Sequence, residues 1–143
     1  MNDKLIQLIY ASSASDLMTE EELLALLEQS REKNARLNLT GILLYKSGNF
    51  LQVLEGPESA VTELYETIKK DERHANILTI ATKEIKERDF GDWKMAFANL
   101  NKLDPASVPG YSEFLNDPFD GKYFAEKPSR AFAFLKVFKD GMR

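Results

Sequence analysis

The first part of the chain has the two-residue hydrophobic period of a β-strand. Ile6, Leu8 and Tyr10 fall on one face of residues 4–10. Residues 11–17 are mostly small and polar, which predicts a loop after this strand. The first face therefore ends in a tyrosine rather than in an aliphatic residue.

The pattern then becomes helical and afterwards returns to strands. Thr19 and Glu22 have the spacing of a capping box, which predicts a helix that runs to about residue 33 or 34. Two apolar segments follow at residues 40–45 and 50–55, and the Lys-Ser-Gly-Asn turn between them predicts a β-hairpin.

A second helix and two more strands complete the pattern. Pro57 suits the first turn of a helix, and residues 61–68 carry an apolar face at helical spacing. Residues 77–85 predict a fourth strand, and residues 90–98 contain a fifth. The order βαββαββ, with a hairpin between two helical crossovers, predicts an α+β, ferredoxin-like sheet with both helices on one face.

The composition changes after residue 100. Pro and Gly interrupt the chain in short pieces, and Ser129 predicts the start of a last helix with apolar residues partly on one side. We therefore expect a sheet domain at residues 1–100 and a C-terminal helical extension at residues 101–143.

Three polar side chains fall on faces that the pattern assigns to the core. Gln52 shares its strand face with Phe50 and Leu54, and Asn34 continues the apolar face of the first helix. Tyr10 ends the face of the first strand. An unpaired buried polar group costs about 1–3 kcal/mol, so these residues predict a polar pocket that suits a planar ring with imide-like donors and acceptors.

Each of these residues also has a purely structural interpretation when it is taken alone. A core Tyr with a bonded hydroxyl is common, a strand Gln can face a sheet edge, and an Asn near a helix end is often a C-cap. Pattern and spacing by themselves leave a ferredoxin-like domain with a polar pocket whose ligand is open.

The composition excludes several chemistries. The chain has 143 residues, no Cys and one His, which removes disulfides, thiolate catalysis, a cysteinyl flavin adduct and a multi-His metal site. The net charge of −4 provides no basic field for nucleic acid or anionic lipid. No apolar segment approaches the roughly 20 residues of a membrane span, so we expect a cytoplasmic protein.

The sequence resembles the BLUF family, sensors of blue light using flavin. The segments that carry the resemblance occur in order and at suitable spacing over roughly residues 4–100, and they are residues 8–12, 34, 39–45, 50–56, 71–74 and 90–95. The resemblance implies a ferredoxin-like fold with the flavin ring between the two helices. It implies a photoreceptor rather than an enzyme, and no metal.

The resemblance also assigns roles to individual residues. Tyr10 and Gln52 match the pair beside flavin N5 and O4, and Asn34 matches the residue at the other polar edge of the ring. Asp71 and Arg73 match positions near the ribityl and phosphate end. The positions that line the ring are Ser30, Leu43, Phe50 and Ile68, and the positions on the strand that repacks in signalling are Trp93 and Met95.

The implied mechanism is a light-driven transfer of an electron and a proton from Tyr10 to the flavin, after which Gln52 rearranges its hydrogen bonds. FAD is the expected cofactor, with FMN or riboflavin as substitutes. The implied partners are a downstream signalling protein and further copies of the chain, as in other short bacterial members. One departure from the family is Lys33, which stands where some members have Asn or His.

Two other functions remain compatible with the residues. One is a ferredoxin-like binding or regulatory module without photochemistry. The other is a small flavin-dependent or acylphosphatase-like enzyme, although the loop after the first strand lacks the arginine that an anion-binding phosphatase loop needs.

Overall fold

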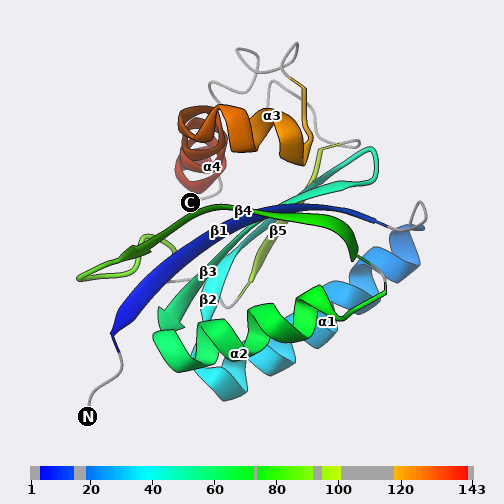
Figure 1. The fold of residues 1–143 in the computed structure, drawn as a ribbon. Helices are drawn as coiled ribbons and strands as arrows, with labels where there is room; N and C mark the ends of the chain where they lie inside the picture. Colours follow the sequence, from blue (N-terminus) through cyan, green and yellow to red (C-terminus); the bar gives the residue numbers. More distant parts are fainter. Residues whose placement is uncertain (1–3, 15–18, 73, 92–94, 101–117, 142–143) are drawn as a thin grey trace.

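The computed structural model describes residues 4–14, 19–72, 74–91, 95–100 and 118–141. Two layers of helices enclose one mixed β-sheet (Figure 1). The elements in chain order are β1 (Leu5–Ala14), α1 (Glu20–Leu37), β2 (Thr40–Lys46), β3 (Asn49–Pro57), α2 (Glu58–Lys69), β4 (His74–Glu84), β5 (Ala96–Asn99), α3 (Gly121–Glu126) and α4 (Pro128–Gly141).

The sheet has the order β4-β1-β3-β2-β5. β1 pairs antiparallel with both β3 and β4, β2 pairs antiparallel with β3, and β5 pairs parallel with β2. Helices α1 and α2 cover one face, and α3 and α4 cover the other (Figure 1). The predicted ferredoxin-like βαββαββ fold with a C-terminal helical segment is confirmed.

Alternating side chains divide the core into two layers. Ile6, Leu8 and Tyr10 of β1 pack toward α1 and α2, whereas Ile9 and Ala11 pack toward α3 and α4. The same alternation continues along β2 and β3, because neighbouring side chains of a strand point to opposite faces. The position of a residue along its strand therefore decides which layer it enters.

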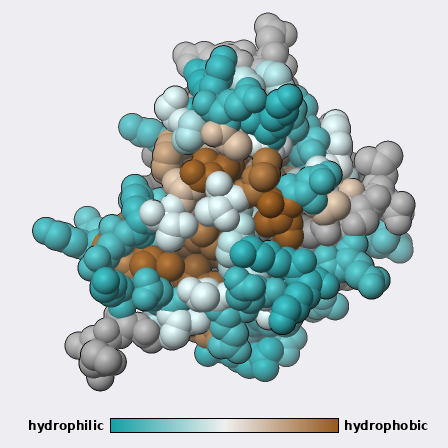
Figure 2. Space-filling view, in the orientation of Figure 1, coloured by the Kyte–Doolittle hydropathy of each residue, from teal (hydrophilic) through white to brown (hydrophobic). Residues whose placement is uncertain are grey.

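The C-terminal helices are part of the second layer. Phe124, Phe134 and Phe138 are buried in one cluster with Leu51 and Val53 of β3. A band of hydrophobic side chains also crosses the middle of the face in Figure 2, with hydrophilic side chains around it. A division of the chain at residue 100 stays a prediction.

Local signals predicted the start of α1 and the hairpin. The Thr19 hydroxyl accepts from the backbone N–H of Glu22 at 3.2 Å, and the Glu22 carboxylate accepts from the backbone N–H of Thr19 at 3.0 Å, which is the capping box. In the β2–β3 turn Ser47 and Gly48 have φ values of 50° and 84°. A turn of this kind needs such positive angles, and Gly adopts them without strain.

Several boundaries differ from the predictions, and β4 also begins earlier, at His74 rather than at residue 77. The segment predicted as a loop after Tyr10 continues β1 to Ala14, because residues 11–13 pair with residues 49–51 of β3. Helix α1 extends to Leu37 and ends at Asn38, which adopts the left-handed conformation with φ 58°. The fifth strand begins only at Ala96, so Met95 precedes it instead of lying within it.

Candidate functional site

Tyr10 and Gln52 lie side by side at the centre of the sheet. They are direct partners in the β1–β3 register, and Leu43 pairs with Gln52 from β2. Tyr10 is 0% exposed and Gln52 5% exposed. The Tyr10 hydroxyl donates a hydrogen bond to Oε1 of Gln52, so the sheet register fixes a phenol against the acceptor end of an amide.

The donor end of the same amide faces Met95. Nε2 of Gln52 lies 3.6 Å from Sδ of Met95, which is 2% exposed. The carbonyl oxygen of Met95 accepts a hydrogen bond from Nε of Arg31, on α1, at 3.1 Å. The side chain of Gln52 is thus linked to Tyr10 at one end and, through Met95, to the start of β5 at the other.

A cleft opens between α1 and α2 above these residues. The space between its atoms amounts to about 560 Å³, and this value includes open solvent at its mouth. The side chains that line it are Tyr10, Leu26, Gln29, Ser30, Lys33, Asn34, Leu43, Gln52, Leu64, Thr67, Ile68 and Asp71.

The contribution of each helix to the cleft follows the helical period. On α1 the lining positions run from Leu26 at i, i+3, i+4, i+7 and i+8, the last being the fully buried Asn34. From Leu64 on α2 they run at i, i+3, i+4 and i+7, the last being Asp71 just beyond the helix. Each helix presents one continuous stripe of mixed apolar and polar residues.

Burial governs the protonation of Tyr10. Desolvation raises the pKa of the Tyr10 phenol far above its ordinary value of 10.0, and the nearby Tyr65 and Asp71 raise this pKa further. Tyr10 is therefore a neutral phenol at physiological pH, with a proton available to donate.

The structure brings most of the predicted site residues together. Seven of them line the cleft: Tyr10, Ser30, Asn34, Leu43, Gln52, Ile68 and Asp71. Phe50 does not line it; its ring packs against Tyr45 with the centroids 5.0 Å apart. Arg73 and Trp93 lie outside the described residues.

Sequence reasoning missed Leu26, Gln29, Leu64 and Thr67 as lining residues, and it considered Lys33 only as a departure from the family. All five belong to the helical stripes that end at Asn34 or at Asp71. The same period applied to polar as well as apolar positions would have found them.

The lining suits a flavin. Leu26, Leu43, Leu64 and Ile68 provide apolar walls. The amides of Asn34 and Gln52 are buried between these walls and offer both donors and acceptors. An isoalloxazine ring needs this combination, because it has two flat faces and a polar, imide-bearing edge. The residues present therefore fit the group.

A family model for sensors of blue light using FAD matches residues 5–96. The chain belongs to the BLUF family. This BLUF chain is also similar to BlrB, a BLUF protein solved in its dark state, with a TM-score of 0.71 and 32% identity over 94% of this chain and 98% of that one. The fold and the flavin-binding blue-light sensor family are thus established together.

Larger proteins contain regions similar to this BLUF domain. The photoactivated adenylate cyclase subunit beta of Euglena longa is 35% identical over 113 residues, which are 78% of this chain but only 13% of that protein. BlrP1 of Klebsiella pneumoniae, solved with FMN and cyclic di-GMP, has a TM-score of 0.70 and 30% identity over 95% of this chain and 34% of its own.

Among the residues that the structure describes, no group of three or more His, Cys, Asp or Glu side chains could hold a metal ion. None of the helices described there is both long and apolar enough to cross a membrane.

Proposed function

We propose that this BLUF protein is a blue-light photoreceptor in which Tyr10 is the photochemical donor and Gln52 the switch. The contact chain from Tyr10 through Gln52 to Met95, at the base of the cleft, carries the proposal. It joins a protonated donor, an amide with two distinct ends and a backbone segment that leads into a strand.

When bound in the cleft, oxidised flavin supplies a chromophore that absorbs blue light and accepts an electron in its excited state. Tyr10 would then donate an electron, and its hydroxyl proton would leave along the hydrogen bond to Gln52. The electron and a proton would later return to Tyr10, and Gln52 would remain rearranged by rotation or tautomerisation. No covalent bond to the protein forms, in agreement with the absence of Cys.

An amide suits this role because its acceptor and donor ends are different. Rotation of the Gln52 side chain would turn its NH₂ group toward Tyr10 and its oxygen toward Met95. Sδ of Met95 is only a weak acceptor and cannot donate to that oxygen. In a buried site such a mismatch is costly, so Met95 and the start of β5 have a reason to move.

Several residues would hold the chromophore. We assign the polar edge of the ring to Asn34 and Gln52, and its walls to Leu43 and Ile68, with Ser30 and Phe50 as weaker candidates. The ribityl and phosphate end is assigned to Asp71 and Arg73, with Lys33 as an additional cation at the cleft. We propose FAD as the flavin, because the family model is described by it, and FMN as a substitute.

The signal would leave through Met95 and Trp93 to a protein partner, rather than through an output enzyme in this chain. The Euglena longa relative supports this view. Its name describes a photoactivated adenylate cyclase, and the region similar to this chain is only 13% of that protein. We also propose a cytoplasmic protein that assembles with copies of itself through its C-terminal helices.

The spectrum of the purified protein tests the proposal. We expect bound flavin and a red shift of its absorption under blue light that reverses in the dark. A flavoprotein without that shift would contradict the sensor. A protein that cannot be loaded with FAD, FMN or riboflavin would contradict the binding site as well.

A further inference from the structure

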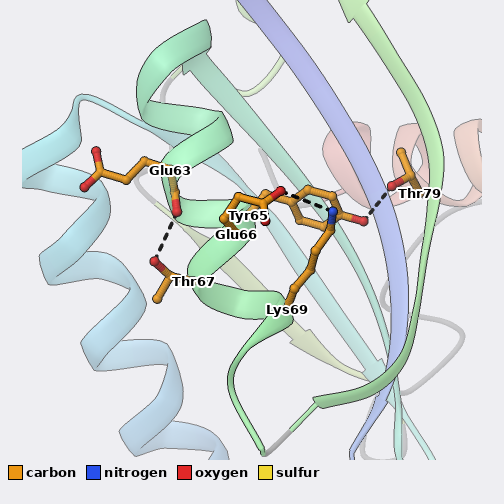
Figure 3. A network of polar contacts seen from close by, with 6 residues as sticks. All are labelled: Glu63, Tyr65, Glu66, Thr67, Lys69 and Thr79. Atoms are coloured by element: carbon orange, nitrogen blue, oxygen red, sulfur yellow. Dashed lines mark hydrogen bonds and ion pairs between the residues drawn. The ribbon is translucent and has the colours of Figure 1, made fainter.

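A second tyrosine packs directly against the proposed donor. Tyr65 of α2 and Tyr10 have ring centroids 5.1 Å apart at an angle of 45°, and Tyr65 is 7% exposed. Its hydroxyl lies 2.6 Å from Oγ1 of Thr79 on β4 (Figure 3). Two phenols thus lie in contact, and electron transfer between them needs no intervening group.

The two hydroxyls lead to different surroundings. The hydroxyl of Tyr10 is enclosed and bonded to Gln52, whereas that of Tyr65 is bonded to Thr79, an exposed residue of the edge strand β4. An oxidised phenol becomes a stable neutral radical only when its proton leaves. Tyr65 has a route for that proton through the exposed Thr79 to water, whereas the proton of Tyr10 is directed to Gln52.

A cation sits over the ring of Tyr65. Nζ of Lys69 is 4.6 Å from the ring centroid and 3.3 Å from a carboxylate oxygen of Glu66 (Figure 3). A cation over an aromatic face is attracted to the electron-rich ring, so it opposes removal of an electron from that ring. The Lys69 side chain is 45% exposed, which weakens this effect through solvent screening.

We propose that Tyr65 is a second electron donor behind Tyr10 and that Lys69 limits its use. The proposal rests on the proposed function, because the oxidant is the Tyr10 radical formed there. One electron passes from the Tyr65 ring to the Tyr10 radical. The Tyr65 hydroxyl proton passes to Thr79 and on to water, while the Tyr10 oxygen regains a proton through Gln52.

Electron transfer from Tyr65 lowers the yield of the rearranged state of Gln52. It moves the oxidised site away from Tyr10 before Gln52 has rearranged, so every such event is lost to signalling. Lys69 keeps the transfer slow and thereby preserves the yield of the lit state. The arrangement predicts opposite effects for variants that remove Tyr65 and variants that remove its cation.

The experiment locates the radical and does not depend on signalling. Flavin-loaded protein is illuminated with a nitroso spin trap, and trapped adducts are mapped by peptide mass spectrometry. The variants are Tyr65→Phe, Lys69→Gln, Thr79→Val and Tyr10→Phe. Lys70→Gln is the matched control, since Lys70 is the exposed neighbour of Lys69 at the C-cap of α2. The quantum yield of the red-shifted state is recorded in parallel.

We expect adducts at Tyr65 in the wild type and none there in Tyr10→Phe. Lys69→Gln raises adduct formation about two- to fivefold, as loss of a partly screened cation–π contact implies, and it lowers the quantum yield. Thr79→Val lowers adduct formation, Tyr65→Phe gives a yield at or above that of the wild type, and Lys70→Gln changes nothing.

Three results would overturn the proposal, each at a different point. Adducts at Tyr10 but not at Tyr65 would refute the second donor. Equal adduct levels in Lys69→Gln and Lys70→Gln would refute the role of Lys69, and either result would leave the photoreceptor intact. Absence of a reversible red shift in the wild type would refute the proposed function and this inference with it.

Discussion

The buried polar groups on the two faces of the sheet have different surroundings. Under α1 and α2, Tyr10, Asn34 and Gln52 line an open cleft. Under α3 and α4, the fully buried carboxylate of Glu55 accepts hydrogen bonds from the protein on both of its oxygens. Polar groups at an open cleft can bind a ligand, whereas a carboxylate that is enclosed and bonded in this way indicates architecture.

Glu55 is the clearest case on the second face. It is 0% exposed, and its carboxylate accepts hydrogen bonds from Gln7 Nε2 at 2.7 Å and from the backbone N–H groups of Asp89 at 2.9 Å and Phe90 at 2.7 Å. It thereby anchors the segment after β4 to the centre of the sheet. In the core on the same face, the rings of Phe119, Phe124 and Phe134 pack edge to face.

The largest effect is expected for Glu55→Ala. Three donors lose their acceptor, and two of them belong to the buried residues Gln7 and Phe90, so the free energy of unfolding should fall by about 3–5 kcal/mol, as measured by urea denaturation. Glu58→Ala, at an exposed position in the first turn of α2, is the control and should change it by less than about 1 kcal/mol. If Glu55→Ala were as stable as the wild type, the hydrogen bonds of Glu55 would not stabilise the fold, and the contrast between the two faces would be wrong.

Unfolding at high pH tests the burial of Tyr10 on the cleft side of the sheet. Burial raises the pKa of Tyr10 above its value of 10.0 in the unfolded chain. The protonated phenol therefore stabilises the fold fully below pH 10, and this contribution is lost as the pH rises further. Relative to Tyr10→Phe, the wild type should lose about 1.4 kcal/mol per pH unit above pH 10. Parallel unfolding curves for the two proteins between pH 9 and 11 would contradict the assigned burial.

Asn34→Leu should weaken flavin binding while the fold remains. Leucine has a similar volume and tolerates burial, but it offers no hydrogen bond to a polar ring edge. We expect about a tenfold higher Kd for the flavin, measured by quenching of flavin fluorescence. Ala35→Leu, on the exposed side of the same turn, should bind as the wild type does. Equal affinities for the two variants would make Asn34 an architectural residue.

The smallest effect is expected for Arg31→Ala. The lost hydrogen bond to the Met95 carbonyl is worth about 0.5–1.5 kcal/mol, so amide hydrogen exchange in residues 95–99 should accelerate by roughly two- to tenfold. Arg36→Ala, in the exposed last turn of α1, is the control. Unchanged amide exchange in Arg31→Ala would show that the Arg31 hydrogen bond does not hold the start of β5 to α1.

Much of the fold follows from local patterns in the sequence. The two-residue period placed Tyr10 and Gln52 on the faces they occupy, and the capping box placed the start of α1. The extension of β1 to Ala14 could not be predicted in this way, because backbone pairing with β3 holds it and its small side chains carry no pattern.

The sequence predicted which face of a helix or strand each site residue occupies. It did not predict contacts between residues that lie far apart in the chain. The position of Asn34 on α1 follows from the helical period. The contact of Gln52 with Met95 joins residues 43 positions apart, and the bonds of Glu55 reach residues 34 and 35 positions away. Only the packed sheet brings these groups together.

The most direct test of the account compares light-minus-dark absorption spectra of flavin-loaded wild type, Tyr10→Phe, Gln52→Leu and Gln29→Leu. Gln29→Leu removes an amide from the same cleft but away from the sheet, so it is the matched control. The account predicts a reversible red shift in the wild type and in Gln29→Leu, and its loss in Tyr10→Phe and Gln52→Leu with flavin still bound. A normal photocycle in Tyr10→Phe or in Gln52→Leu would contradict it.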